Sequence, residues 1–185
     1  HDPLRRQRQM CIRDRCVGLN GDAFYRPMAV QGDWADYTGS VMAIDPSGRG
    51  KDETAYAVVK MLNGQLFVTK AGGLSGGYDD QTLQKLCDIA KEEKVNLVLI
   101  ESNFGDGMFT KMITPFFMRT HKVTIEEIRH NTQKEKRIVD TLEPVFNQHR
   151  LIINQDVIDR DYASTQHLPP ESALKYQLFY QISRV

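Results

Sequence analysis

The sequence predicts one α/β domain with a mixed central sheet, and three observations support this prediction. The 185 residues are 41% hydrophobic, which is enough for one buried core. Three runs rich in β-formers come first, and Asn63-Gly64, a strong two-residue hairpin signal, separates the last two. Helical and extended patterns then alternate along the chain, which is typical of an α/β sheet flanked by helices.

The elements are predicted from apolar periodicity. The first three strands are expected at 41–45, 54–62 and 65–71, and form an antiparallel meander. The remaining elements are a helix around Leu83–Ala90, a strand at 96–101, a helix around Phe109–Phe117, a strand at 123–128, a helix around Ile138–His149, a strand at 151–154 and a helical pattern over 171–185. The strand at 96–101 is almost unbroken apolar sequence, which favours a strand covered on both faces. This order is that of the ribonuclease H-like fold, in which the first strand pairs with the fourth.

Two acidic residues each close a short apolar run that is expected to be a buried strand. Asp45 ends V-M-A-I-D and Glu101 ends L-V-L-I-E. If the first and fourth strands are neighbours, the two carboxylates lie at the same edge of the sheet. They would repel each other unless a cation lies between them, and Mg²⁺ or Mn²⁺ prefers such oxygen ligands. Simpler roles exist, since Asp45 could start a turn and Glu101 could approach the next helix.

Further charged residues near these acids have ordinary structural interpretations. Asp52 is expected to end a turn, and Asp106 is expected to cap the helix that follows it. Lys51 follows a glycine, but the pattern of a nucleotide-binding phosphate loop is not matched, so no ATPase motif is present. Lys134, Lys136 and Arg137 open a helix, where they could be solvated or could contact nucleic-acid phosphates.

Composition excludes several other classes of function. The three cysteines and five histidines lack paired ligand spacing, which argues against a zinc site and favours a reduced, intracellular setting. No apolar stretch approaches the length of a membrane span. Five arginines fall within residues 1–15, and the rest of the chain holds 19 basic and 22 acidic side chains. Bulk charge therefore gives no support for nucleic-acid binding, and a local site has to supply it.

The first part of the chain is expected to lie outside the domain. Residues 1–15 have no periodic apolar face, and they are predicted to be disordered or foreign to the protein. Residues 16–40 are expected to form a linker, with Trp34 and Tyr37 as its large anchors. The domain itself is predicted to span 41–185.

Four motifs resemble one known family. I-D-P-S-G-R-G-K-D-E-T, K-M-L-N-G-Q-L-F-V, I-E-S-N-F-G-D-G-M-F and D-T-L-E-P-V are together similar to the large terminase subunit (DNA maturase B) of short-tailed tailed phages, from about Tyr37 onwards. The resemblance implies a ribonuclease H-like endonuclease domain that cuts concatemeric double-stranded phage DNA in the host cytoplasm. It also implies an upstream ATPase domain, a portal and a small terminase subunit as partners.

The resemblance also implies a catalytic site. Asp45 and Glu101 are then the first two members of a metal-binding acidic triad that takes two Mg²⁺ or Mn²⁺ ions, with Asp45 bridging both ions. The family's third acid lies in a late helix segment that is not found here, so we expect the third ligand beyond residue 185 and weak cleavage by this chain. Asp156, Asp159 and Asp161 are available acids without support from the family pattern.

Two other classes of function stay open at this point. One is an ATP-binding domain of the actin/sugar-kinase type, which shares a related sheet but needs a second phosphate loop and an adenosine pocket. The other is a non-catalytic docking module for the portal or the small terminase subunit. Tight ATP binding would favour the first, and partner binding without metal binding would favour the second.

Overall fold

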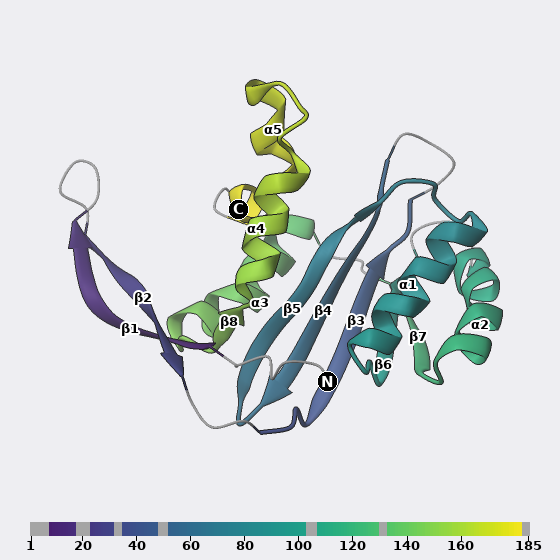
Figure 1. Cartoon of the computed structure of the whole chain (residues 1–185), viewed down its shortest axis with the longest axis horizontal. Helices are drawn as coiled ribbons and strands as arrows, with labels where there is room; N and C mark the ends of the chain where they lie inside the picture. Colours follow the sequence, from purple (N-terminus) through teal and green to yellow (C-terminus); the bar gives the residue numbers. More distant parts are fainter. Residues whose placement is uncertain are drawn as a thin grey trace.

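The computed structural model describes residues 8–17, 23–31, 35–47, 52–102, 107–129 and 133–182. The main sheet is built from β3 (Gly39–Asp45), β4 (Thr54–Leu62), β5 (Gln65–Leu74), β6 (Leu97–Glu101), β7 (Thr124–Ile128) and β8 (Leu151–Ile153). The helices are α1 (Asp80–Glu92), α2 (Met108–Thr120), α3 (Lys134–Asn147), α4 (Gln155–Ser164), α5 (Pro170–Tyr176) and α6 (Leu178–Ile182). Figure 1 shows the twisted sheet between α1 and α2 on one side and α4 and α5 on the other.

The strand order of the main sheet is β7-β6-β3-β4-β5-β8. Strands β3, β4 and β5 are antiparallel neighbours, whereas β6, β7 and β8 each run parallel to the strand beside them. The predicted pairing of the first and fourth strands of the domain is therefore confirmed as β3 beside β6. The Asn63-Gly64 turn is also confirmed, because both residues have positive φ angles, 50° and 76°, as a tight hairpin turn requires.

One face of the sheet carries the core. Met42 and Ile44 of β3, Val58 of β4, and Val98 and Ile100 of β6 are all at most 2% exposed. Helices α1 and α2 cover these side chains with the apolar faces that the sequence predicts, whose buried residues are Leu83, Leu86, Cys87, Ala90, Phe109, Ile113 and Phe117. Successive strand residues point to opposite faces, so the residues between these core positions point to the other face.

The other face of the sheet is less covered than the sequence predicts. In β6, buried residues alternate with half-buried ones, and Leu97 and Leu99 belong to the half-buried set. Ala43 of the neighbouring β3 is exposed. The expectation of a strand covered on both faces is therefore wrong in this structure, because α1 and α2 both pack on the face of Val98 and Ile100. This second face is also the one toward which Asp45 and Glu101 point.

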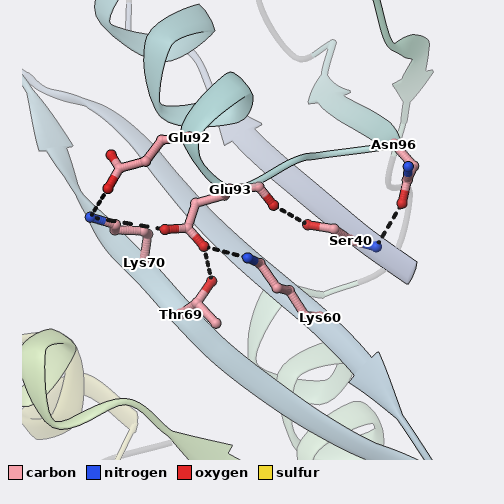
Figure 2. A network of polar contacts seen from close by, with 7 residues as sticks. All are labelled: Ser40, Lys60, Thr69, Lys70, Glu92, Glu93 and Asn96. Carbon is pink, nitrogen blue, oxygen red and sulfur yellow. Dashed lines mark hydrogen bonds and ion pairs between the residues drawn. The ribbon is translucent and has the colours of Figure 1, made fainter. Parts of the chain in front are cut away.

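A buried polar network joins the end of α1 to β4 and β5 (Figure 2). Glu93 is 2% exposed, and its Oε2 lies 2.7 Å from Nζ of Lys60 and accepts a 2.9 Å hydrogen bond from the hydroxyl of Thr69. Lys70 lies farther away, at 4.0 Å from Oε1. Burial alone would raise the pKa of Glu93, but these partners outweigh it and lower the pKa. The hydroxyl of Ser40 donates to the backbone oxygen of Glu93, which ties the network to the start of β3.

The segment before β3 packs onto the sheet at the same end. The ring of Tyr37 meets Phe67 edge to face at 5.2 Å between centroids, and Nζ of Lys60 lies 5.1 Å from the centre of the Tyr37 ring. Thr38 donates its backbone N–H to Met61, at 2.8 Å. Tyr37 is thus an anchor of the incoming chain, as predicted, whereas Trp34 lies outside the described residues.

The N-terminal part differs from the sequence expectation. Strands β1 (Arg8–Val17) and β2 (Ala23–Gln31) pair antiparallel in a hairpin that stands apart from the main sheet (Figure 1). These two strands lie within residues 1–40, which are expected from the sequence to be a disordered or foreign segment (1–15) and a linker (16–40). A two-stranded ribbon outside the main sheet needs no apolar alternation for backbone pairing, so periodicity does not reveal it. The domain start at residue 41 remains a prediction.

The C-terminal part also departs from the predicted pattern. Helix α4 was not predicted, and the single helical pattern over 171–185 is divided into α5 and α6 by extended backbone at Gln177. Asp161 of α4 caps the second of these helices, since its carboxylate accepts the N–H groups of Leu178 at 2.7 Å and Phe179 at 3.1 Å. Among the described residues, no helix is long and apolar enough to cross a membrane.

Candidate functional site

The two acids predicted to form a site lie at equivalent positions on neighbouring strands. Strands β3 and β6 are paired in parallel, and Ile44 opposite Ile100 is the last paired position. Asp45 and Glu101 each come one residue later, at the carboxyl ends of the two strands. Since both isoleucines point into the core, both acids point to the other face. The structure therefore brings together the two residues on which the sequence prediction rests.

The carboxylate of Glu101 is close enough to Asp45 to affect the charge of Asp45. Asp45 is exposed as a residue, but the surrounding protein removes part of the water from its carboxyl group and raises its pKa. The negative charge of Glu101 raises the pKa of Asp45 further, and the charges of Lys134 and Arg137 lower it in part. Two neighbouring carboxylates, one of which disfavours the ionised form of the other, are a suitable donor set for a hard divalent cation.

The first turn of α3 supplies positive charge to this pair of acids. Nη2 of Arg137 lies 3.8 Å from Oε1 of Glu101, and the two side chains are 27% and 20% exposed. Lys134 is three residues earlier on the helix, on the same side as Arg137, and its charge reaches Asp45. Lys136 is two residues from Lys134, so it projects from a different side of the helix. The structure thus groups Lys134 and Arg137 with the acids but leaves Lys136 apart.

Hydrogen bonds outside the predicted set fix the two strand ends. The hydroxyl of Thr54, which is fully buried, accepts from the backbone N–H of Ser47 at 3.1 Å and lies 3.3 Å from the backbone oxygen of Gly77. It thereby holds the segment after Asp45 against the turn between β5 and α1. Sequence reasoning did not single out Ser47 or Thr54, because a single serine after a strand and a single threonine at the start of the next strand carry no periodic signal.

The end of β6 is fixed in a similar way. The backbone N–H of Ser102 donates to Ile128 at 2.9 Å, and Nε of Arg129 donates to the Ser102 hydroxyl at 3.1 Å. These contacts tie the residue after Glu101 to the neighbouring strand β7. Gly107 follows with a left-handed φ of 79° and begins α2, so this glycine and not Asp106 is the N-cap residue. Asp106 itself lies outside the described residues, as does Lys51.

The remaining candidate acids are not joined to the pair. Asp52 is exposed before β4. Asp159 accepts a hydrogen bond from Gln155 on its own helix, Asp156 lies in the first turn of that helix, and Asp161 is used as a helix cap. Helix α4 contacts β5, which β4 separates from β3. Within the described ranges, no group of three His, Cys, Asp or Glu side chains is arranged to hold a metal ion.

Glu126 is an acid near the pair that the sequence reading did not select. It is paired with Leu99 on the neighbouring strand, so it belongs to the same face of the sheet as Glu101. Its exposed position on β7 distinguishes it from the half-buried Glu101. The sequence T-I-E-E-I does not alternate regularly, so it did not indicate the direction of this side chain.

Comparison with known proteins places this geometry in a family. The family model described as Terminase Bacteriophage T7, Ribonuclease H-like domain matches residues 44–151, from the end of β3 to the start of β8. The large terminase subunit of Enterobacteria phage T3 is 46% identical over 169 residues. That alignment covers 91% of this chain and 29% of the relative, so the chain spans less than a third of the relative's length.

Several solved structures are similar to this chain at low sequence identity. The large terminase of a thermophilic bacteriophage has a TM-score of 0.49 at 13% identity, covering 71% of this chain and 33% of that one. The human cytomegalovirus terminase nuclease domain soaked with Mn has a TM-score of 0.46 at 11% identity, covering 65% and 67%. The nuclease domain of the large terminase subunit of bacterial virus Sf6 has a TM-score of 0.42 at 19% identity, covering 56% and 44%.

Proposed function

We propose that this chain is a metal-dependent endonuclease that cuts concatemeric phage DNA during genome packaging. The reason is that the chain belongs to the family of ribonuclease H-like domains of T7-type phage terminases. The observation that carries the proposal is the placement of Asp45 and Glu101 at equivalent positions of two neighbouring parallel strands. The proposed substrate is double-stranded DNA in the host cytoplasm. An ATPase domain, a portal and a small terminase subunit are the proposed partners of the longer protein.

The two acids fit a divalent cation on chemical grounds. Each offers carboxylate oxygens, and the pKa of Asp45 is raised first by partial burial and then by the negative charge of Glu101, which Mg²⁺ or Mn²⁺ would neutralise. When bound, two such ions supply an activated water and stabilise the leaving oxygen in phosphodiester hydrolysis. Asp45 and Glu101 would hold the ions through their carboxylate oxygens. The third carboxylate is proposed to come from beyond residue 185.

The cations of α3 have a second role in the same proposal. Lys134 and Arg137 lie beside the acids, where a scissile phosphate would also have to lie, and Lys136 extends the positive charge along the helix. Lysine and arginine side chains position a nucleic-acid backbone without reading its sequence. We assign all three residues to phosphate contact, with Lys134 and Arg137 nearest to the reacting phosphate.

Plasmid nicking with Mg²⁺ or Mn²⁺ tests the function. Both this chain and a version lengthened at its C-terminus are compared with their Asp45→Asn and Glu101→Gln variants. We expect the lengthened version to nick faster and both substitutions to abolish its nicking. Asp159→Asn is the control, because this acid lies on α4 and bonds within its own helix. Undiminished nicking by the Asp45 and Glu101 variants would refute the assignment.

The same preparations separate the two other classes of function. Tight binding of ATP, with no response to Mg²⁺ in the absence of nucleotide, would favour the actin/sugar-kinase alternative. Binding to a portal or small terminase subunit without any metal response would favour a docking module. We expect neither result, because the positions of Asp45 and Glu101 are explained by a cation site.

A further inference from the structure

The pair of acids has cationic partners on α3. Arg137 reaches Glu101 at 3.8 Å, and Lys134 and Arg137 both act on Asp45. Two negative charges therefore face two positive charges from a single helical turn. The positive charges of α3 neutralise the two carboxylates, as a bound divalent cation would also do. The metal and α3 therefore compete for the same negative charge.

Helix α3 is weakly held, which makes such competition possible. None of its residues is buried, although Ile138, Leu142 and Val145 form a half-buried apolar stripe. Its N-cap residue, Gln133, makes no side-chain capping hydrogen bond. Few buried contacts mean a low cost of local rearrangement. The first turn of α3 can therefore move without disturbing the core on the opposite face of the sheet.

We propose that Arg137, assisted by Lys134, is a counter-ion that occupies Glu101 until metal binds, and that metal binding releases the first turn of α3 for contact with phosphate. The inference rests on the proposed metal site. It adds a coupling between metal and helix that phosphate contact alone does not require. A cation that leaves Glu101 when metal arrives would be available to the DNA only once the site is loaded.

Two simpler roles of Arg137 predict different changes in metal affinity when Arg137 is replaced and no DNA is present. If Arg137 only oriented Glu101 for the metal, its removal would weaken metal binding. If it only contacted phosphate and made no ion pair with Glu101, its removal would change metal affinity no more than the removal of Lys136 does. A competing counter-ion instead weakens metal binding while it is present, so its removal must strengthen metal binding.

The first test measures Mn²⁺ affinity by calorimetry without DNA. Compared with the unmodified chain, Arg137→Gln is expected to bind Mn²⁺ roughly threefold to tenfold more tightly, because one positive charge beside the ion is gone. Lys134→Gln is expected to change the affinity in the same direction by less. Lys136→Gln is the matched control, since it removes the same charge from the same turn but from another side. An unchanged or weaker affinity of Arg137→Gln, or an equal gain in Lys136→Gln, would overturn the proposal.

The second test follows Arg137 directly by NMR during a Mg²⁺ titration. The Nε–Hε signal of Arg137 is expected to move toward its position in metal-free Glu101→Gln, where the ion pair is also absent. A Mg²⁺ response of the amides of Asp45 and Glu101 without movement of the Arg137 signal would reject the coupling but keep the metal site. No Mg²⁺ response in the unmodified chain, or the same response in Asp45→Asn, would reject the metal site and the coupling with it.

Discussion

Lys60 and Glu93 form a 2.7 Å ion pair at the end of the sheet opposite the two site acids. Lys60 is paired across the sheet with Ser40 at the start of β3, whereas Asp45 closes that strand. The ion pair between Lys60 and Glu93 connects the end of α1 to β4 and involves none of the residues assigned to the site. Stability and function can therefore be tested at separate places in this domain.

Replacing Glu93 is expected to destabilise the fold strongly. Glu93→Gln leaves Lys60, whose side chain is 13% exposed, without its charged partner, and should lower the free energy of unfolding by roughly 2–4 kcal/mol. Urea unfolding followed by circular dichroism measures this loss. Glu92→Gln is the matched control on the neighbouring residue, where the side chain is 55% exposed and a loss below about 1 kcal/mol is expected. Equal losses in the two variants would show that burial of the pair is unimportant.

The ionisation of Glu93 also leads us to expect a loss of stability at acidic pH. The pKa of Glu93 is lowered from 4.5 in the folded protein, so its ionised form contributes stability above that value. This contribution is lost as the pH falls below 4.5 and through the folded-state pKa. The urea midpoint of the unmodified chain should therefore fall over this window more steeply than that of Glu93→Gln. Parallel curves for the two proteins would contradict the prediction.

The buried hydroxyl of Thr54 is expected to hold the turn after Asp45. Thr54→Val keeps the shape of the side chain but leaves Ser47 N–H without its acceptor, which should cost roughly 1–3 kcal/mol of stability. Thermal or urea unfolding measures this cost. Thr54→Ser retains the hydroxyl and should lose clearly less, so a larger loss in the serine variant would assign the effect to the methyl group instead.

Asp45 is expected to reduce the stability of the fold when no metal is present. Because the pKa of Asp45 is raised, its ionised form disfavours the folded state at neutral pH. Asp45→Asn should therefore be slightly more stable than the unmodified chain in the presence of a chelator, by a small amount because solvent screens an exposed carboxylate. Millimolar Mg²⁺ should raise the melting temperature of the unmodified chain only. A metal-induced rise of equal size in Asp45→Asn would place the ion elsewhere.

The cations of α3 are expected to contribute separately to DNA binding. Each phosphate contact that is lost should reduce the slope of log affinity against log salt concentration by about 1. Arg137→Gln and Lys136→Gln should each show this reduction in fluorescence anisotropy with a DNA duplex, without a change in sequence preference. A slope equal to that of the unmodified chain would show that the substituted residue does not contact the DNA.

Local patterns were sufficient to predict the framework of the domain. Val41–Asp45 and Asn96–Glu101 each combine an apolar run with a terminal acid, and the sequence alone indicated both strands and both candidate ligands. The Asn63-Gly64 turn and the apolar faces of α1 and α2 were equally readable, because strand and helix periodicity are properties of neighbouring residues. The hairpin β1–β2 and helix α4 were missed where no such periodicity exists.

The sequence by itself therefore determined the order of the elements and the chemistry available at their ends. Only the tertiary structure decided which groups meet: Arg137 with Glu101, Lys60 with Glu93, and Thr54 with Ser47. It also decided that α1 and α2 share one face, which leaves Asp45 and Glu101 on the less covered one. The physical reason is that an ion pair or a buried hydroxyl depends on the distance between segments that packing brings together, and single charged or polar residues leave no periodic trace in the sequence.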